Sequence, residues 1–225
     1  MSATHAKLTL PQRQLEIAWQ CASLLIGYPD QQLVSQAPLL RQGTADLPLR
    51  LRTPLVRFID HLERTPLPQL AVDYVETFDH TRRCCLYLTY FASGDTRKRG
   101  VALLAFKQAY QRAGLVLTDA ELPDHLSVVL EFGATADHLT AWRLLLDHRA
   151  GLELLRIALR DTDSPWADVI EAVTTTLPPL RGDERVAIAR LIAEGPPDET
   201  VGLAPFAPPE YTPSRDTASR TGALA

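Results

Sequence analysis

The chain has 225 residues, enough for one domain with a sizeable core. Its formal net charge of −4 argues against a general polyanion binder, because such proteins carry a basic field. Three cysteines without a spaced framework argue against a disulfide-stapled secreted protein, and no apolar run reaches the roughly 18 to 20 residues of a membrane span. The sequence therefore predicts a cytoplasmic protein without a membrane-inserted segment.

Apolar residues recur at helical spacing through most of the chain, while glycine is scarce and β-branched runs are rare. Pro11 can open the first helix, and Asp30 can cap the second. The fold class predicted is all-α. The expected helices cover about residues 11–26, 30–40, 51–62, 70–78, 96–113, 122–133, 137–161, 164–173 and 183–192.

Three expectations concern details of these helices. Leu86–Phe91 has strand-like propensity but no evident partner strand, so a buried helix or an irregular buried segment is expected. Gly151 is the expected point of division in the long pattern 137–161. The helix that ends before Gly114 carries the expected pattern Val101, Leu104, Ala105, Gln108 and Ala109.

The composition changes near residue 195. Six prolines follow, and no apolar period is sustained. Such a segment cannot bury enough apolar surface to offset the entropy lost on ordering. The chain is therefore predicted to consist of one helical domain, residues 1–194, and a proline-rich disordered tail, residues 195–225.

Metal and catalytic signatures are weak. Glu121 and His125 stand four residues apart, but no Glu-x-x-His motif occurs, and the adjacent Cys84 and Cys85 would point apart. No metal site, no cofactor and no catalytic residue are predicted.

Two basic stretches could in principle carry a function. Arg82 and Arg83 would lower the pKa of a neighbouring thiol, yet no partner of a Cys-His enzyme lies nearby, so one buried cysteine and one on a polar face are expected. The run 97–99 is Arg-Lys-Arg in an acidic chain, which favours a solvated helix face over a nucleic-acid contact.

The Pro123-Asp124-His125 turn has two interpretations. Proline and aspartate suit a helix N-terminus, so a simple capping turn explains both. The imidazole is not required for a cap. A polar handle beside Phe132 and a face formed by Tyr74 and Phe78 would suit an amphipathic peptide laid in a groove.

Two sequence strings resemble a known family. YVETFDHTRRCCLYLTYFASGDTRKRGVALLAFKQAYQRAGL and ELPDHLSVVLEF, between about Tyr74 and Gly133, are similar to the NarJ family of nitrate reductase molybdenum cofactor assembly chaperones. The second string resembles the Pro-Asp-His helix of the wider group of redox-enzyme maturation proteins. Ser127 stands where a second proline is common in that group.

The resemblance implies a single globular helical bundle of the redox-enzyme maturation type that is not an enzyme. It implies a cytoplasmic chaperone that binds the N-terminal segment of the apo catalytic (alpha) subunit of respiratory nitrate reductase. That subunit would stay competent for molybdenum cofactor and iron–sulfur insertion before membrane docking. A monomer is expected. The peptide-binding residues implied are Tyr74, Phe78, Arg82, Arg83, Asp124, His125 and Phe132.

An alternative function is a small helical metal- or thiol-dependent oxidoreductase that uses His125 and Cys84 or Cys85. A helical DNA-binding regulator is a third class, but it would need a basic recognition helix that the sequence lacks.

Overall fold

The all-α prediction is confirmed. A computed structural model describes residues 10–94, 97–116, 121–180 and 182–194, and these residues contain helices and no strand. The tail predicted from residue 195 lies outside them. The α-helices are α1 (Gln12–Ile26), α2 (Gln31–Gly43), α3 (Leu49–Arg64), α4 (Leu67–Phe78), α5 (Tyr90–Ser93), α6 (Arg97–Arg112), α7 (Leu126–Thr135), α8 (His138–Asp147), α9 (Arg149–Asp161), α10 (Trp166–Thr175) and α11 (Gly182–Glu194), and the short 3-10 turns are η1 (Thr44–Asp46) and η2 (Arg82–Cys84).

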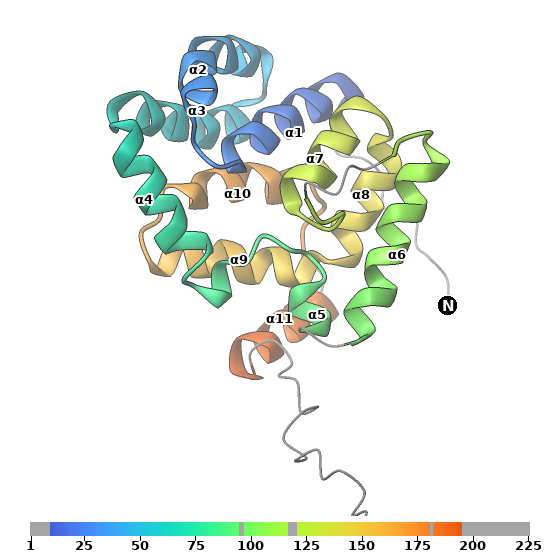
Figure 1. Ribbon diagram of the computed structural model, residues 1–225. Helices are drawn as coiled ribbons and strands as arrows, with labels where there is room; N and C mark the ends of the chain where they lie inside the picture. The colour runs from blue at the N-terminus through green and yellow to red at the C-terminus, as the bar shows by residue number, and fades with distance from the viewer. Residues whose placement is uncertain (1–9, 95–96, 117–120, 181, 195–225) are drawn as a thin grey trace, which may run out of the picture.

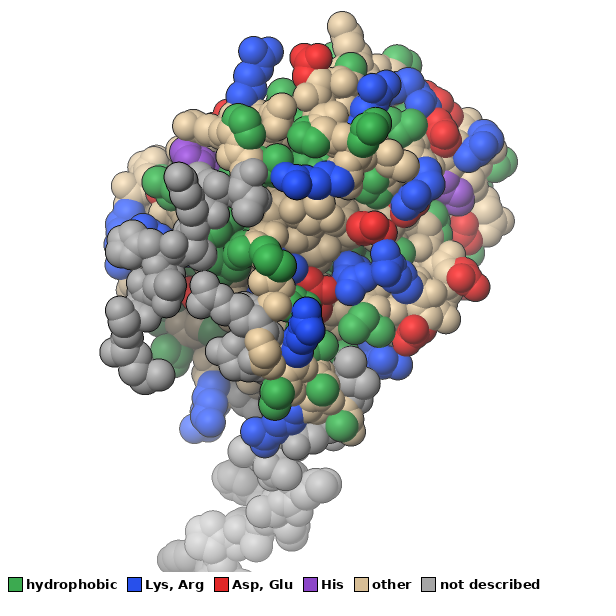
Figure 2. Space-filling model, turned by 180° about the vertical axis from the view of Figure 1, so that it is seen from behind, with side chains coloured by type: hydrophobic (Ala, Val, Ile, Leu, Met, Phe, Trp, Pro, Cys, Tyr) green, Lys and Arg blue, Asp and Glu red, His purple; other side chains and the backbone are tan. Residues whose placement is uncertain are grey.

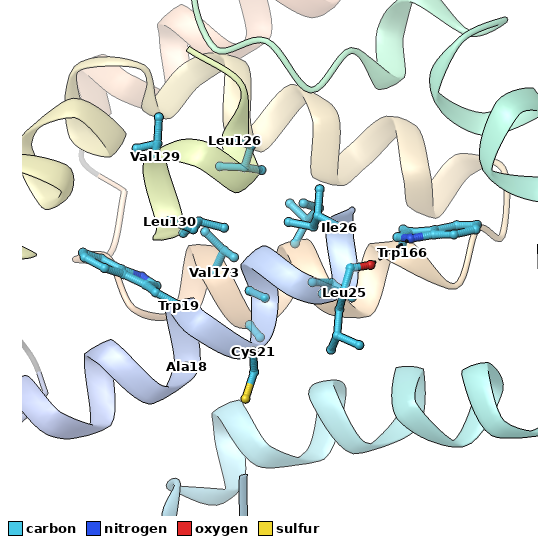
Figure 3. Close-up of a cluster of buried hydrophobic side chains, with 14 of the residues drawn as sticks. Ala18, Trp19, Cys21, Leu25, Ile26, Leu126, Val129, Leu130, Trp166 and Val173 are labelled. Atoms are coloured by element: carbon cyan, nitrogen blue, oxygen red, sulfur yellow. Dashed lines mark hydrogen bonds between the residues drawn. The ribbon is translucent and has the colours of Figure 1, made fainter. Parts of the chain in front are cut away.

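Helix α1 lies at the centre of the bundle, between α7 and α10, with α2 and α3 above it in Figure 1. Its buried side chains meet those of α7 and α10 in one apolar cluster (Figure 3). Two tryptophans fix this packing with hydrogen bonds. The indole of Trp166 donates to the carbonyl of Leu25 at 3.2 Å, and the indole of Trp19 donates to the hydroxyl of Thr176 at 3.0 Å. Burying these indoles without acceptors would be costly.

The predicted helix starts are confirmed where they depend on residues within one turn of the chain. The first helix follows Pro11, and the Asp30 carboxylate accepts from the backbone N–H of Leu33 at 2.7 Å. Asp137 likewise accepts from the N–H groups of Leu139 and Thr140 at the start of α8.

The long helical pattern divides at a different residue from the one expected. The break falls at His148, where φ is −109° and ψ is 19°, so Gly151 lies inside α9. Gly151 instead allows a close approach, because a Cβ there would stand 2.7 Å from Cδ2 of Phe91. The glycine is needed for interhelical packing, which local sequence cannot reveal.

Helix α6 buries a different face from the expected one. Val101 is 71% exposed and Leu104 is 54% exposed, whereas Phe106, Ala109 and Tyr110 are buried. Ala109 belonged to the expected pattern, but the burial of Phe106 and Tyr110 turns the buried face away from Val101 and Leu104.

The segment after α4 is irregular and buried, as predicted. Leu86, Leu88 and Phe91 enter the core, and one isolated antiparallel bridge joins Tyr87 to His125. Among the described residues, none of the helices combines the length and the hydropathy of a membrane span.

Candidate functional site

The Pro-Asp-His turn is held against the irregular segment by backbone hydrogen bonds. The N–H of Leu88 donates to the carbonyl of Asp124 at 3.0 Å, and the N–H of Leu126 donates to the carbonyl of Leu86 at 2.9 Å. Helix α7 therefore begins at Leu126, with His125 as its cap, and not at residue 122 as expected. These hydrogen bonds to a distant segment fix residues 122–125, which therefore do not form the first turn of the helix.

The Asp124 carboxylate lies at the centre of this arrangement and is fully buried. Its Oδ2 accepts from the hydroxyl of Thr89 at 2.5 Å and from the Thr89 backbone N–H at 3.1 Å. Among the described residues, its Oδ1 has no hydrogen-bond donor. A buried carboxylate is costly without a nearby positive charge or several hydrogen-bond donors. The stability of the turn therefore depends on the groups around Asp124.

Arg99 supplies that positive charge. Its Nη2 lies 3.9 Å from Oδ2 of Asp124, its Nε donates to the Thr89 hydroxyl at 3.3 Å, and its guanidinium stands 5.2 Å from the Tyr87 ring centroid. The expectation of a solvated face therefore fails for this residue, although Arg97 and Lys98 are exposed. A cation over an aromatic ring and beside a carboxylate is stabilised by both.

His125 caps α7 and is largely buried. Its Nδ1 accepts from the N–H of Ser127 at 3.3 Å and lies 2.7 Å from the Ser127 hydroxyl. Burial lowers the pKa of the imidazole, against the opposing charges of Glu121 and Asp124. The residue is thus a neutral acceptor in the folded protein.

A chain of aromatic and acidic groups leads from His125 towards α4. The ring of Tyr87 meets that of His125 edge-on at 5.2 Å, and the Tyr87 hydroxyl donates to Glu121 at 3.1 Å. Burial raises the pKa of Tyr87 to about 12, helped by Glu121. Burial also raises the pKa of Tyr74, and the charges of Asp79 and Glu121 add to it. The Tyr74 phenol therefore lies in the field of Glu121.

Tyr74 and Phe78 form an aromatic cluster with Trp166. The rings of Tyr74 and Phe78 lie 4.8 Å apart, and they stand 5.7 Å and 5.4 Å from the Trp166 ring. Tyr28 adds an edge contact to Tyr74 at 5.4 Å and is itself 57% exposed. Phe78 is partly buried, so this cluster reaches the surface.

A cleft of about 310 Å³ opens beside the aromatic cluster, between α4 and the turn that precedes α10. Three carboxylates line it, on Asp73, Glu76 and Asp163, and Trp166 belongs to both the cleft and the cluster. Asp73 and Glu76 stand three residues apart on α4, a spacing that could have been read from the sequence. The place of Asp163 in the cleft could not be read from the sequence, because this residue lies in the turn after α9.

The remaining candidate residues lie elsewhere. Phe132 is buried and packs on Tyr110 of α6 at 4.6 Å, and no described ring contact joins it to Tyr74 or Phe78. Arg82 and Arg83 are exposed in η2, and Arg83 lies 3.8 Å from Asp161. The expectation that His125, Phe132 and the α4 aromatics form one face is not met in this conformation.

The two adjacent cysteines differ, as expected. Cys84 is buried, and burial raises the pKa of its thiol to about 11 in spite of Arg83, which acts in the opposite direction. Cys85 is partly exposed. Among the described residues no group of three His, Cys, Asp or Glu side chains is placed to hold a metal ion.

The helical fold resembles that of a solved protein of redox enzyme maturation. A crystal structure of a protein assigned to redox enzyme maturation, from Archaeoglobus fulgidus, superimposes with a TM-score of 0.52 over 85% of this chain and 99% of that one. The two sequences are 22% identical, so the likeness concerns the fold alone.

The sequence comparisons define the family. A family model described as nitrate reductase delta subunit matches residues 44–171. The NarJ protein of Bacillus subtilis strain 168 is 30% identical over 163 residues, which cover 72% of this chain and 89% of that protein. The chain therefore belongs to the nitrate reductase delta subunit family, as the resemblance to NarJ indicated.

Two further relatives extend this finding. The nitrate reductase molybdenum cofactor assembly chaperone NarJ of Escherichia coli K12 is 31% identical over 64% of this chain and 63% of its own length. The nitrate reductase-like protein NarX of Mycobacterium tuberculosis H37Rv is 40% identical over 165 residues. The matched residues make up 72% of this chain and 24% of that protein.

Proposed function

We propose that this protein is an assembly chaperone of respiratory nitrate reductase. It binds the N-terminal segment of the apo catalytic subunit and keeps that subunit competent for molybdenum cofactor and iron–sulfur insertion before membrane docking. It acts as a monomer in the cytoplasm and catalyses no reaction itself. The observation that carries the proposal is its membership of a family whose relative in Escherichia coli is named as such a chaperone.

The peptide site proposed is the aromatic cluster of Tyr74 and Phe78 together with the acidic cleft beside it. An amphipathic segment needs an apolar surface next to groups that complement its charges. Phe78 supplies partly exposed apolar surface, and Asp73 and Glu76 stand on the same helix. A basic amphipathic segment would bury its apolar side on the rings and direct its cations into the cleft.

Asp124 and His125 act in this proposal chiefly by positioning. Both are buried; Asp124 bonds to Thr89 and so joins the turn to the segment that carries Tyr87, while His125 bonds to Ser127 at the start of α7. A peptide cation could reach the Asp124 carboxylate only if the turn opened.

The flanking candidates complete the proposed site. Arg82 and Arg83 are open at the surface and are proposed to meet acidic residues of the segment. Phe132 is proposed to support the turn from behind, through its packing on Tyr110, whose hydroxyl donates to the carbonyl of Pro123 at 2.5 Å.

Calorimetric titration tests the proposal. A synthetic peptide of the N-terminal segment of the catalytic subunit is titrated into the protein, and micromolar or tighter binding is expected. Neutralising the cleft with Asp73→Asn and Glu76→Gln should weaken binding about tenfold if one buried charge pair is lost. Asp147→Asn combined with Asp46→Asn is the matched control, because it removes two exposed carboxylates that do not line the cleft.

A second pair of variants separates contact from positioning. Asp124→Asn removes the charge, whereas Thr89→Val disturbs the same turn and leaves the charge in place. Equal losses of affinity would assign Asp124 a positioning role, and a larger loss in Asp124→Asn would assign it a direct contact. Unchanged affinity in all these variants, each shown to be folded, would remove this surface from the peptide site.

A further inference from the structure

A second cleft, of about 480 Å³, lies between α9, α10 and α11, and the start of α3 closes one side. The rear face of the molecule carries a group of lysine and arginine side chains with acidic ones between them (Figure 2). Arginine is the commonest residue type in the lining of this cleft. The five arginines are Arg50, Arg149, Arg156, Arg160 and Arg185.

Two glutamates of the same cleft are already neutralised. The buried carboxylate of Glu153 is paired with Arg149 and with Arg156, each at 2.7 Å. Glu171 is paired with Arg160 at 2.5 Å. A buried carboxylate held by two guanidinium groups keeps those groups in fixed positions at the cleft wall.

The described lining therefore holds more positive than negative charge. Five arginines face two glutamates, which leaves three formal positive charges in excess. Arg50 and Arg185 are exposed, and neither forms an ion pair with a described carboxylate. A concave wall of one sign raises the local concentration of ions of the opposite sign.

Part of the cleft lining is apolar and stiff. It is formed by the consecutive residues Leu177, Pro178, Pro179 and Leu180. Two adjacent prolines restrict the backbone, so this wall is preformed. A cleft lined by both arginines and a stretch of apolar residues suits a ligand with an anionic end and an organic body.

We propose that this cleft binds a small phosphate ester. The phosphate lies on Arg50 and Arg185, supported by the paired arginines behind them, and the organic part lies on the proline wall. Arginine suits this ligand because its planar guanidinium donates two parallel hydrogen bonds to phosphate oxygens. No residue of this cleft lines the acidic cleft beside Trp166, so the two sites can be tested separately.

The test titrates inorganic pyrophosphate, adenosine monophosphate and adenosine into the full chain by calorimetry, at low salt. The monophosphate should bind, pyrophosphate should bind more weakly because it lacks a body for the apolar wall, and adenosine should not bind. The affinity of the monophosphate should fall as salt is raised.

Variants locate the binding. Arg50→Gln combined with Arg185→Gln should weaken binding of the monophosphate at least tenfold, because both residues are exposed and their loss should leave the fold intact. Arg13→Gln combined with Arg112→Gln removes the same charge from exposed positions outside the cleft and should leave binding unchanged. If both double variants weaken binding of the monophosphate equally, the loss comes from the change in net charge, and the proposal is overturned.

Two other outcomes would also overturn it. The first is absence of binding by the monophosphate and pyrophosphate up to millimolar concentration. The second is binding of a hexaglutamate peptide in preference to both phosphates, which would assign the cleft to an acidic protein segment.

Discussion

The hydroxyl of Thr89 donates a 2.5 Å hydrogen bond to the buried carboxylate of Asp124, which lies 35 residues further along the chain. The same carboxylate oxygen accepts from the Thr89 backbone N–H at 3.1 Å. This contact joins the irregular segment after α4 to the turn that starts α7. It therefore sets the position of Tyr87 and His125 relative to the aromatic residues of α4.

The Thr89 hydroxyl should contribute to stability. Thr89→Val keeps the shape of the side chain but leaves a buried carboxylate with one donor fewer, which should lower the free energy of unfolding by about 1 to 3 kcal/mol. Urea denaturation measures the effect. Thr135→Val is the matched control, because the Thr135 hydroxyl is exposed and bonds only within its own helix. A loss no larger than that of the control would show that Asp124 does not depend on this donor.

Gly133 should be intolerant of a side chain. A Cβ at this position would stand 2.5 Å from Cε3 of Trp19 and 2.6 Å from the Cβ of Ala141, where α1, α7 and α8 meet. Gly133→Ala should therefore lower stability by about 1 to 3 kcal/mol through overpacking. Gly100→Ala, in α6, meets nothing within 4 Å and should raise stability by about 0.5 to 1 kcal/mol. Thermal unfolding of both variants should give shifts of opposite sign.

Stability should fall between neutral and mildly acidic pH. Burial lowers the pKa of His125 in the folded state, so the unfolded chain takes up a proton below its ordinary pKa of about 6.5 while the folded chain does not. Above that pH both states are neutral, and the group adds no pH dependence. Burial lowers the pKa of His61 as well. Each of the two histidines can contribute up to about 1.4 kcal/mol per pH unit.

A capping variant isolates the His125 contribution. His125→Asn keeps a side-chain acceptor at the start of α7 but cannot titrate. It should reduce the slope of stability against pH between about 7 and 5, and the remaining slope should come from His61. The same slope in His125→Asn and the wild type would rule out this source of acid sensitivity.

Cys84 should be unreactive in the folded protein. Burial raises its thiol pKa to about 11, which disfavours the thiolate that reacts with alkylating agents. Iodoacetamide followed by mass spectrometry should label Cys85 first and Cys84 only after unfolding in urea. A Cys84→Ala, Cys85→Ala double variant should still support maturation of nitrate reductase. Rapid labelling of native Cys84 would revive the thiol-dependent alternative.

Much of the fold follows from the sequence by itself. Helical periodicity predicted the all-α class, and the starts at Pro11 and Asp30 depend on chemistry within one turn of the chain. The resemblance to the NarJ family rested on two strings, and the family comparison confirms it. The spacing of Tyr74 and Phe78 placed both rings on one face of a helix, where the structure has them in contact.

The tertiary structure alone decided what these residues meet. The sequence indicated a capping or peptide-binding role for Asp124, but not that it is buried against Thr89 and Arg99, which come from other segments. Gly151 was the expected division of a long helix, yet it is a point of close packing, as is Gly133. Periodicity reports which side of a helix is apolar, but the partner of a side chain depends on contacts between segments far apart in the chain. For that reason the spacing of Asp73 and Glu76 on α4 was the part of the acidic cleft that the sequence could indicate, and the arginine cleft, built from separate helices, gave no signal as a site.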